Sequence, residues 1–240
     1  MVNSSEVKSF ALGVGFSAVG VIGRDRISHI PVGPISDLHV HRSSKEILSS
    51  VRSIVILGYH VWDPIYNVVA TKADDSGAPF HQLYAVVAMS KSWEVAHYLE
   101  ALGYEAVATT GICLKKAAVL AGIGAQGKHT VVISPDFGPS LRFAAVLTSA
   151  ELEDDAPFTW DICGSCTKCV DACPTKALKP HEIDISRCMV YAVENPSSER
   201  VSASVRELEK QLIRRPTAHS FIECTICLDA CPFGRTAGKG

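Results

Sequence analysis

The chain has 240 residues, of which 23 are Lys or Arg and 25 are Asp or Glu, giving a formal net charge of -2. Its composition is 47% hydrophobic and 20% charged, which is ordinary for a globular protein and excludes wholesale disorder and a strongly basic surface field. A membrane span needs about 18 consecutive apolar residues, and we find no such run. Residues 1–6 lack the basic segment of a signal peptide, so we expect a cytoplasmic protein without a membrane partner.

The N-terminal part of the sequence alternates helical and strand-like segments. A Ser at position 4 or 5 can cap a helix that runs to Leu12, and residues 16–22 follow as a strand. Residues 53–61 are a continuous apolar run with β-branched members, which predicts a buried strand. Between residues 81 and 102 the apolar positions recur at helical spacing, which predicts a helix with one stripe facing a core. That stripe consists of Val86, Met89, Trp93, Ala96, Leu99 and Leu102.

The next segments complete an α/β domain. Residues 105–109 predict a strand, and residues 114–121 predict a short helix that ends at a glycine. The strand-like residues 130–134 and 141–148 flank a turn rich in Pro and Gly, which predicts a hairpin.

An acidic segment followed by proline, residues 151–157, separates this region from a short, cysteine-rich remainder. We therefore expect two domains, residues 1–156 and residues 157–240. The second domain is interrupted by a charged helical stretch at residues 198–215.

Nine cysteines carry the main chemical signal, because eight of them lie between positions 163 and 231. In a reducing compartment such a cluster is typical of metal ligands and not of disulfides. Cys163-x2-Cys166-x2-Cys169-x3-Cys173-Pro is the run of bacterial ferredoxins, in which three thiolates hold one 4Fe–4S cluster and the fourth reaches another. The ninth cysteine, Cys113, is expected to be a small buried apolar residue.

A second run, Cys224-x2-Cys227-x3-Cys231-Pro, repeats this pattern without its first member, because Phe221 occupies that position. Counting ligands assigns Cys163, Cys166, Cys169 and Cys231 to cluster A. Cluster B then takes Cys173, Cys224 and Cys227, and the remaining cysteine, Cys188, completes it. We therefore predict two 4Fe–4S clusters.

Two other metal assignments fit parts of this pattern. Pairs of Cys-x2-Cys also bind zinc, and eight cysteines could form two four-thiolate zinc sites. The x2-x2-x3 spacing with a following proline and a partial second copy favours iron–sulfur clusters. A three-iron cluster is not required, since no ligand is missing.

A glycine-rich loop spans residues 121–130, with glycines in a G-x-G-x-x-G spacing. Glycine allows a ligand to approach the backbone closely. The loop follows a predicted helix and precedes a predicted strand, whereas a dinucleotide-binding fingerprint needs a strand, the loop and then a helix. The spacing alone therefore indicates a glycine-rich turn and not a Rossmann fold.

The loop, residues 131–143 and the eight-cysteine pattern together resemble the epoxyqueuosine reductase family and the related corrinoid reductive dehalogenases. The resemblance implies a nitroreductase-like α/β domain that holds cobalamin, followed by a small ferredoxin-like domain with two 4Fe–4S clusters. It also implies that the loop contacts the corrinoid. The residues concerned are Gly122, Gly124, Gly127, Lys128 and His129.

The sequence departs from this family in two ways. A gapless count from the loop puts Ala108 where epoxyqueuosine reductases carry a catalytic Asp, and the chain lacks the helical-repeat extension with which many of them hold tRNA. On these grounds we do not expect tRNA to be the substrate. The dehalogenases use a tyrosine as proton donor, which makes Tyr59 and Tyr84 the candidate catalytic residues.

We therefore expect an iron–sulfur, corrinoid-dependent reductase of a small molecule or a protein, supplied by an external low-potential donor of the ferredoxin or flavodoxin type. One alternative is an electron-transfer or corrinoid-reducing module without a substrate of its own. Another is a nitroreductase-like protein that binds flavin in place of the corrinoid.

Overall fold

The computed structural model describes residues 2–36, 39–70 and 81–233. The chain divides into two compact units, each built from separate segments of sequence. Unit 1 comprises residues 1–60, 85–125 and 141–160, and unit 2 comprises residues 61–84, 126–140 and 161–240. Unit 1 thus ends close to the expected domain boundary, but unit 2 also includes two segments that precede it.

A four-stranded antiparallel sheet forms the centre of unit 1, with the strand order β1-β4-β10-β7. The strands are β1 (Ala18–Gly23), β4 (Ser53–His60), β10 (Leu141–Thr148) and β7 (Ala106–Thr109). The predicted strand at residues 53–61 is confirmed as β4, and all its residues except the last are buried. A central strand covered on both faces has no alternation of polar residues, which explains its continuous apolar sequence.

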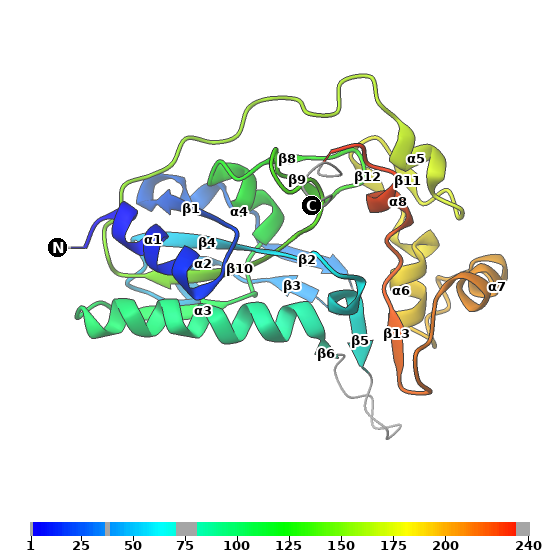
Figure 1. Ribbon diagram of the computed structural model, residues 1–240, viewed down its shortest axis with the longest axis horizontal. Helices are drawn as coiled ribbons and strands as arrows, with labels where there is room; N and C mark the ends of the chain where they lie inside the picture. The colour runs from blue at the N-terminus through cyan, green and yellow to red at the C-terminus, as the bar shows by residue number, and fades with distance from the viewer. Residues whose placement is uncertain (1, 37–38, 71–80, 234–240) are drawn as a thin grey trace. The chain divides into compact units, whose positions relative to one another are not determined.

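Helices pack on both sides of this sheet, as Figure 1 shows for α3 (Leu83–Ala101) and α4 (Leu114–Leu120). The helix α1 (Ser4–Val14) begins with a capping box between Asn3 and Glu6 and ends at Gly15 in the left-handed conformation. Its cap is therefore Asn3 and not one of the two serines that follow. The short helix α2 (Ser44–Ile47) has a second capping box, formed by Ser43 and Glu46.

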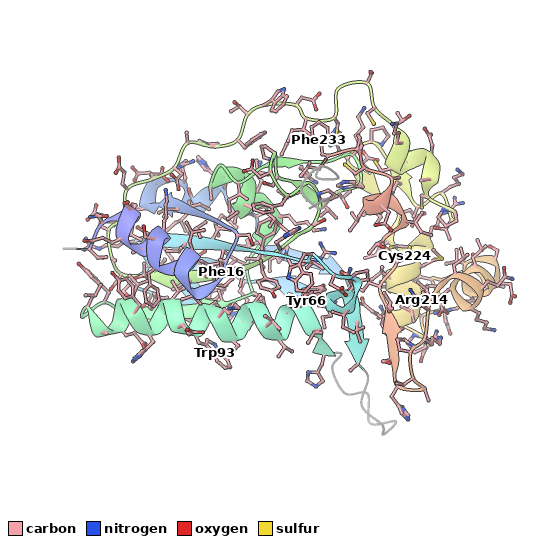
Figure 2. The ribbon with its side chains drawn as sticks, in the orientation of Figure 1. Phe16, Tyr66, Trp93, Arg214, Cys224 and Phe233 are labelled. Atoms are coloured by element: carbon pink, nitrogen blue, oxygen red, sulfur yellow. The ribbon has the colours of Figure 1, made fainter. Side chains whose placement is uncertain are left out.

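The apolar stripe predicted for α3 is only partly correct. Val86, Trp93 and Leu102 are exposed, with Trp93 at 62% of its full accessibility. Figure 2 shows the Trp93 side chain extending from the lower side of α3. The buried positions are mostly small, which lets the helix backbone lie close to its neighbours. These positions are Ala88, Ser92, Val95, Ala96 and Leu99.

The predicted hairpin of residues 130–134 and 141–148 is wrong. The strand β10 pairs with β4 and β7, whereas β9 (Val132–Ile133) belongs to a separate small sheet with β8 (Ala125–Gln126). A single bridge between Ser134 and Gly138 closes the turn. The turn chemistry was therefore recognised correctly, but the strands that it joins have other partners.

Three further short elements of unit 1 lie between β1 and α2. They are the 3-10 helix η1 (Arg24–His29) and the paired strands β2 (Gly33–Ser36) and β3 (His39–His41). Prolines and polar residues of this region are typical of a loop, so its sequence does not predict these short elements.

Unit 2 contains a three-stranded antiparallel sheet in the order β13-β5-β6 and a small ribbon of β11 and β12. Its strands are β13 (Ser220–Ile222), β5 (Val68–Ala70), β6 (His81–Gln82), β11 (Leu178–Lys179) and β12 (Glu182–Ile183). Its helical elements are η2 (Pro64–Asn67), α5 (Lys168–Ala172), η3 (Ile185–Arg187), α6 (Met189–Glu194), α7 (Ala203–Leu212) and α8 (Ile226–Asp229). The helix α7 lies within the charged stretch expected to be helical, and it begins after the Ser202 cap. Within the described residues, no helix combines the length and hydropathy required to cross a bilayer.

Candidate iron–sulfur site and its neighbouring loop

The eight clustered cysteines all belong to unit 2, where short helices carry or follow most of them. Cys169 lies in α5 and Cys227 lies in α8, while Cys173 and Cys231 follow these two helices. Cys188 is the cap residue before α6. A one-turn helix turns the backbone tightly enough for cysteines three residues apart to point to a common centre, which suits an iron–sulfur cluster.

The electrostatic neighbours of the cysteines fall into two groups. Burial raises the pKa of Cys169, and the thiols of Cys163 and Cys231 add to this effect. Burial likewise raises the pKa of Cys188, with a further contribution from Cys173. In the predicted assignment Cys169, Cys163 and Cys231 belong to cluster A, and Cys188 and Cys173 belong to cluster B.

The remaining cysteines of the second group behave in the same way. Burial raises the pKa of Cys224 to about 11, and Cys188 and Cys173 contribute to this rise. Burial raises the pKa of Cys227 to about 12, with contributions first from Cys224, Cys188 and Cys173 and last from Cys169. The thiols of Cys188, Cys224 and Cys227, whose pKa values are all raised, resist ionisation unless a cation compensates their charge. Bound iron would supply that compensation and keep the thiols deprotonated.

Two further positions of the cysteine pattern are Cys166, a predicted cluster A ligand, and Phe221, which occupies the position of the missing cysteine. Cys166 is partly buried, and its backbone N–H donates to the carbonyl of Cys163. Phe221 is 2% exposed and packs with Val69 and Met189 in an apolar cluster, as expected for a position without a metal ligand. Among the described residues, no group of three or more His, Cys, Asp or Glu side chains is arranged to hold a single metal ion.

A short internal repeat surrounds the two cysteine runs, and it includes more residues than the cysteine spacing noted in the sequence. Residues 166–174 and 224–232 share the pattern Cys-Thr-x-Cys-x-Asp-Ala-Cys-Pro. In both copies the threonine hydroxyl donates to the aspartate carboxylate, at 2.7 Å for Thr167 to Asp171 and 2.8 Å for Thr225 to Asp229. The helices of the two copies, α5 and α8, pack against each other. A comparison of the chain with itself would have found this repeat.

Several hydrogen bonds support the cysteine loops. The Asp161 carboxylate accepts from the backbone N–H of Cys163 at 3.0 Å, and the Ala177 N–H donates to the Cys173 sulfur at 3.3 Å. Although burial opposes it, hydrogen bonding from Thr175 and Ala177 lowers the pKa of Cys173. Donors to a ligating sulfur also tune the reduction potential of a cluster. Asp161 and Thr175 are therefore functional candidates that the sequence analysis missed.

Packing within the protein requires glycine at two positions of the loop at residues 121–130. Gly122 has a φ of +73°, and a Cβ there would lie 2.6 Å from the carbonyl oxygen of Ala156. A Cβ at Gly127 would lie 2.7 Å from atoms of both His129 and Ile133. Close packing of the chain on itself therefore accounts for both glycines without a ligand.

The other candidate residues of the loop are also buried or make contacts within the protein. The Lys128 ammonium donates to the carbonyl of Gly164 at 2.6 Å, which fixes the turn between Cys163 and Cys166. His129 is 2% exposed, and its Nδ1 accepts from the backbone N–H of Val131, so the proton of the neutral ring is on Nε2. Gly124 is buried. The Lys128 contact supports the turn that carries the first predicted cluster A cysteines. These contacts do not by themselves form a corrinoid-binding site.

Replacing Gly122 with alanine should destabilise unit 1. The left-handed backbone costs a residue with a Cβ about 1–2 kcal/mol, and displacing the Ala156 carbonyl adds to this cost. Gly103 is a matched control, because its φ of +89° is also positive but a Cβ there meets nothing within 4 Å. Thermal unfolding should show a larger loss for Gly122→Ala than for Gly103→Ala. Equal losses would show that the carbonyl contact is unimportant.

The two tyrosines proposed as proton donors have different surroundings. Tyr59 is 8% exposed on β4 opposite Arg142 of β10. The Tyr84 hydroxyl donates to the Glu223 carboxylate at 3.2 Å. Gln82 donates to both Glu223 and Glu194, at 2.9 and 3.2 Å. Tyr84 thus belongs to a hydrogen-bonded group with two carboxylates in unit 2.

Comparison with known proteins agrees with this architecture. Residues 162–234 match the model of a 4Fe–4S double cluster binding domain. An epoxyqueuosine reductase of Gloeobacter violaceus is 27% identical over 261 residues, an alignment that covers 98% of this chain and 77% of the relative. The corresponding enzyme of Synechocystis sp. is 27% identical over 201 residues, covering 80% of this chain and 65% of the relative. This chain is a homologue of the epoxyqueuosine reductases.

Comparison of the fold with solved structures also finds epoxyqueuosine reductases. A crystal structure of an epoxyqueuosine reductase aligns with a TM-score of 0.70 and 20% identity, covering 98% of this chain and 66% of that one. A catabolic reductive dehalogenase aligns with a TM-score of 0.54 and 16% identity, covering 85% of this chain and 33% of that one. The predicted resemblance to both groups is confirmed, as is the mixed α/β architecture with a C-terminal 4Fe–4S domain. The chain therefore spans about two thirds of the length of several relatives that it matches.

The expectation that tRNA would not be the substrate is wrong. The curated relatives are named epoxyqueuosine reductase, and one structural neighbour is an epoxyqueuosine reductase with an epoxyqueuosine-modified tRNA stem loop. The gapless count behind that expectation is a poor guide, because it points to Ala108 inside β7, where the residue pairs with Val146. A count of residues that allows no insertions or deletions cannot locate the counterpart of a residue in a distant relative.

Proposed function

We propose that this protein is an iron–sulfur reductase that converts epoxyqueuosine in tRNA, with electrons entering from an external low-potential donor. The observation that carries the proposal is the gathering of eight cysteines around the packed helices α5 and α8, within a segment that matches a double-cluster domain. The names of the homologues supply the substrate. Two bound clusters would supply single electrons at low potential.

The protein's own residues have distinct parts in this proposal. The eight cysteines hold the clusters, and Lys128 and Asp161 fix the turn that carries the first cluster A ligands. The N–H of Ala177 and the hydroxyl of Thr175 lie beside the Cys173 sulfur and stabilise its charged form. Tyr59 and Tyr84 are the proposed proton donors to the substrate.

The decisive experiment is a turnover assay with anaerobically reconstituted protein, a low-potential reductant and tRNA that carries epoxyqueuosine. Mass spectrometry of the digested tRNA should detect the reduced nucleoside. Cys224→Ser is the matched inactive variant, because it removes a proposed cluster B ligand and leaves the rest of the chain unchanged. Failure of fully iron-loaded protein to convert the nucleoside, with and without added cobalamin, would refute the function.

Cobalamin is the cofactor that the dehalogenase relationship adds to this proposal, since one such neighbour is described for B12-dependent dehalogenation. A corrinoid would supply a cobalt centre that, once reduced, is strongly nucleophilic. Because the contacts of Gly122, Gly127, Lys128 and His129 are internal, no catalytic step is assigned to it.

Cobalamin binding has a direct optical test. We expect added cobalamin to bind with its lower base displaced, which changes its absorption spectrum. Gly124→Val should weaken this binding, because a buried branched side chain would block close approach to the backbone, while the iron content stays unchanged. Uptake of flavin without any response to cobalamin would instead favour the flavin-binding alternative.

A further inference from the structure

A cavity lies wholly within unit 1, and none of the clustered cysteines lines it. Its volume is about 780 Å³, and it is lined by η1 and by the segment that runs from Arg42 through α2 to Arg52. This volume is in the range of small-molecule sites. Tyr59 is not among the residues that line the cavity. The cavity is therefore distinct from the surroundings of Tyr59.

The lining of this cavity is strongly cationic and rich in hydroxyl groups. Four basic side chains and five serines line it, together with one carboxylate and four aliphatic residues. The basic residues are Arg24, Arg42, Lys45 and Arg52, and the carboxylate is Asp25. Because the whole protein has a net charge of -2, this local excess of positive charge is not a general property of its surface.

The basic side chains are available to a ligand. Among the described residues, no ion pair is found for Arg24 or Lys45. Arg52 pairs with Glu151 at 3.1 Å, but both side chains are at least half exposed, so solvent screens the pair and makes it weak. Arg42 donates one bond to the carbonyl of Glu46 at 3.1 Å, and its guanidinium keeps other donors.

We propose that this cavity binds a ligand that carries phosphate groups. Guanidinium groups match phosphate oxygens with two parallel hydrogen bonds, and a lysine ammonium adds a compact charge. The Ser50 hydroxyl already donates to the Glu105 carboxylate, and the other serine hydroxyls of the lining can donate to the remaining oxygens. Two sources supply this chemistry, namely the backbone of an RNA and a small phosphate ester. The inference does not depend on the proposed reductase function, because it concerns binding alone.

Isothermal titration of the holoprotein with inorganic pyrophosphate at low salt tests the proposal. The wild type should show saturable binding, and Arg24→Gln with Lys45→Gln should weaken it by at least about tenfold, since bonds to charged groups are removed. The matched control is Lys116→Gln with Lys210→Gln, which removes the same charge from exposed positions outside the cavity. Unchanged iron content and melting temperature will show that each variant is folded.

Competition then distinguishes the two sources. Displacement of pyrophosphate by unmodified tRNA identifies an RNA backbone as the ligand, whereas displacement by adenosine diphosphate alone identifies a small phosphate ester. Absence of saturable binding, equal affinity of the two double variants, or failure of both competitors would each overturn the proposal. None of these outcomes requires turnover, so they can be separated from a failure of the proposed function.

Discussion

Replacing Cys188 with serine should remove one cluster and leave the other in place. In the proposed ligand scheme only cluster B uses Cys188, and burial followed by the Cys173 thiol raises the pKa of Cys188. Wild-type protein should contain about eight irons and eight labile sulfides, and the variant about half of each. Iron and sulfide analysis, together with electron paramagnetic resonance of the reduced protein, will measure the loss. Turnover should be abolished, because the path for electrons is broken.

Cys113→Ser is the matched control for this variant. Cys113 is only partly buried, at the start of α4 in unit 1, and lies outside the cysteine repeat. Its substitution should leave both clusters intact. An unchanged iron content and spectrum in Cys188→Ser would show that this residue is not a ligand. Stoichiometric zinc without sulfide in the wild type would contradict the two-cluster assignment altogether.

Glu194→Gln should stabilise the protein at alkaline pH. Burial raises the pKa of Glu194 to about 7, and the neighbouring Glu223 carboxylate adds to this effect, while the hydrogen bond from Gln82 opposes it. Glutamine has almost the same shape and keeps a carbonyl oxygen for Gln82, but it carries no charge that must be buried. The expected gain above pH 7 is up to about 3 kcal/mol in the free energy of unfolding.

The sign of this effect follows from the protons bound in each state. Between pH 4.5 and about 7 the unfolded chain releases the Glu194 proton while the native state keeps it, so the stability of the wild type falls as the pH rises. Denaturant unfolding at several pH values should show this fall in the wild type and a reduced fall in Glu194→Gln. The exposed Glu199→Gln is the control, and it should follow the wild type. Parallel profiles for all three proteins would contradict the assignment.

The sequence alone was sufficient where local chemistry determines the structure. The buried strand β4 is evident from its apolar run, and the short helix α4 from the apolar residues that precede a glycine. The spacing of the cysteines identifies the cluster domain, because ligands to one cluster must lie within a few residues of each other. Such features need no knowledge of distant parts of the chain.

Features that depend on tertiary partners were less accessible. Trp93 of α3 is exposed although it lies in the predicted apolar stripe, because helical spacing alone does not tell an exposed apolar residue from a buried one. Packing of the small residues determines which face of α3 is buried. The strand β10 has a turn before it but pairs with β4, which is more than 80 residues earlier in the chain. Likewise β5, in the first third of the chain, pairs with β13 near residue 220. Sequence patterns carry no signal for such distant pairing.

The paired repeats around α5 and α8 have a consequence for the order in which the protein matures. In the proposed scheme each repeat gives its last cysteine to the cluster of the other. Cys173 therefore shares cluster B with Cys224, and Cys169 shares cluster A with Cys231. A ribosome must therefore reach Cys227 before cluster B can receive its full set of ligands, and Cys231 before cluster A can. Cluster insertion would then follow synthesis, and each inserted cluster would close a loop of about 50–60 residues that the unfolded chain leaves open.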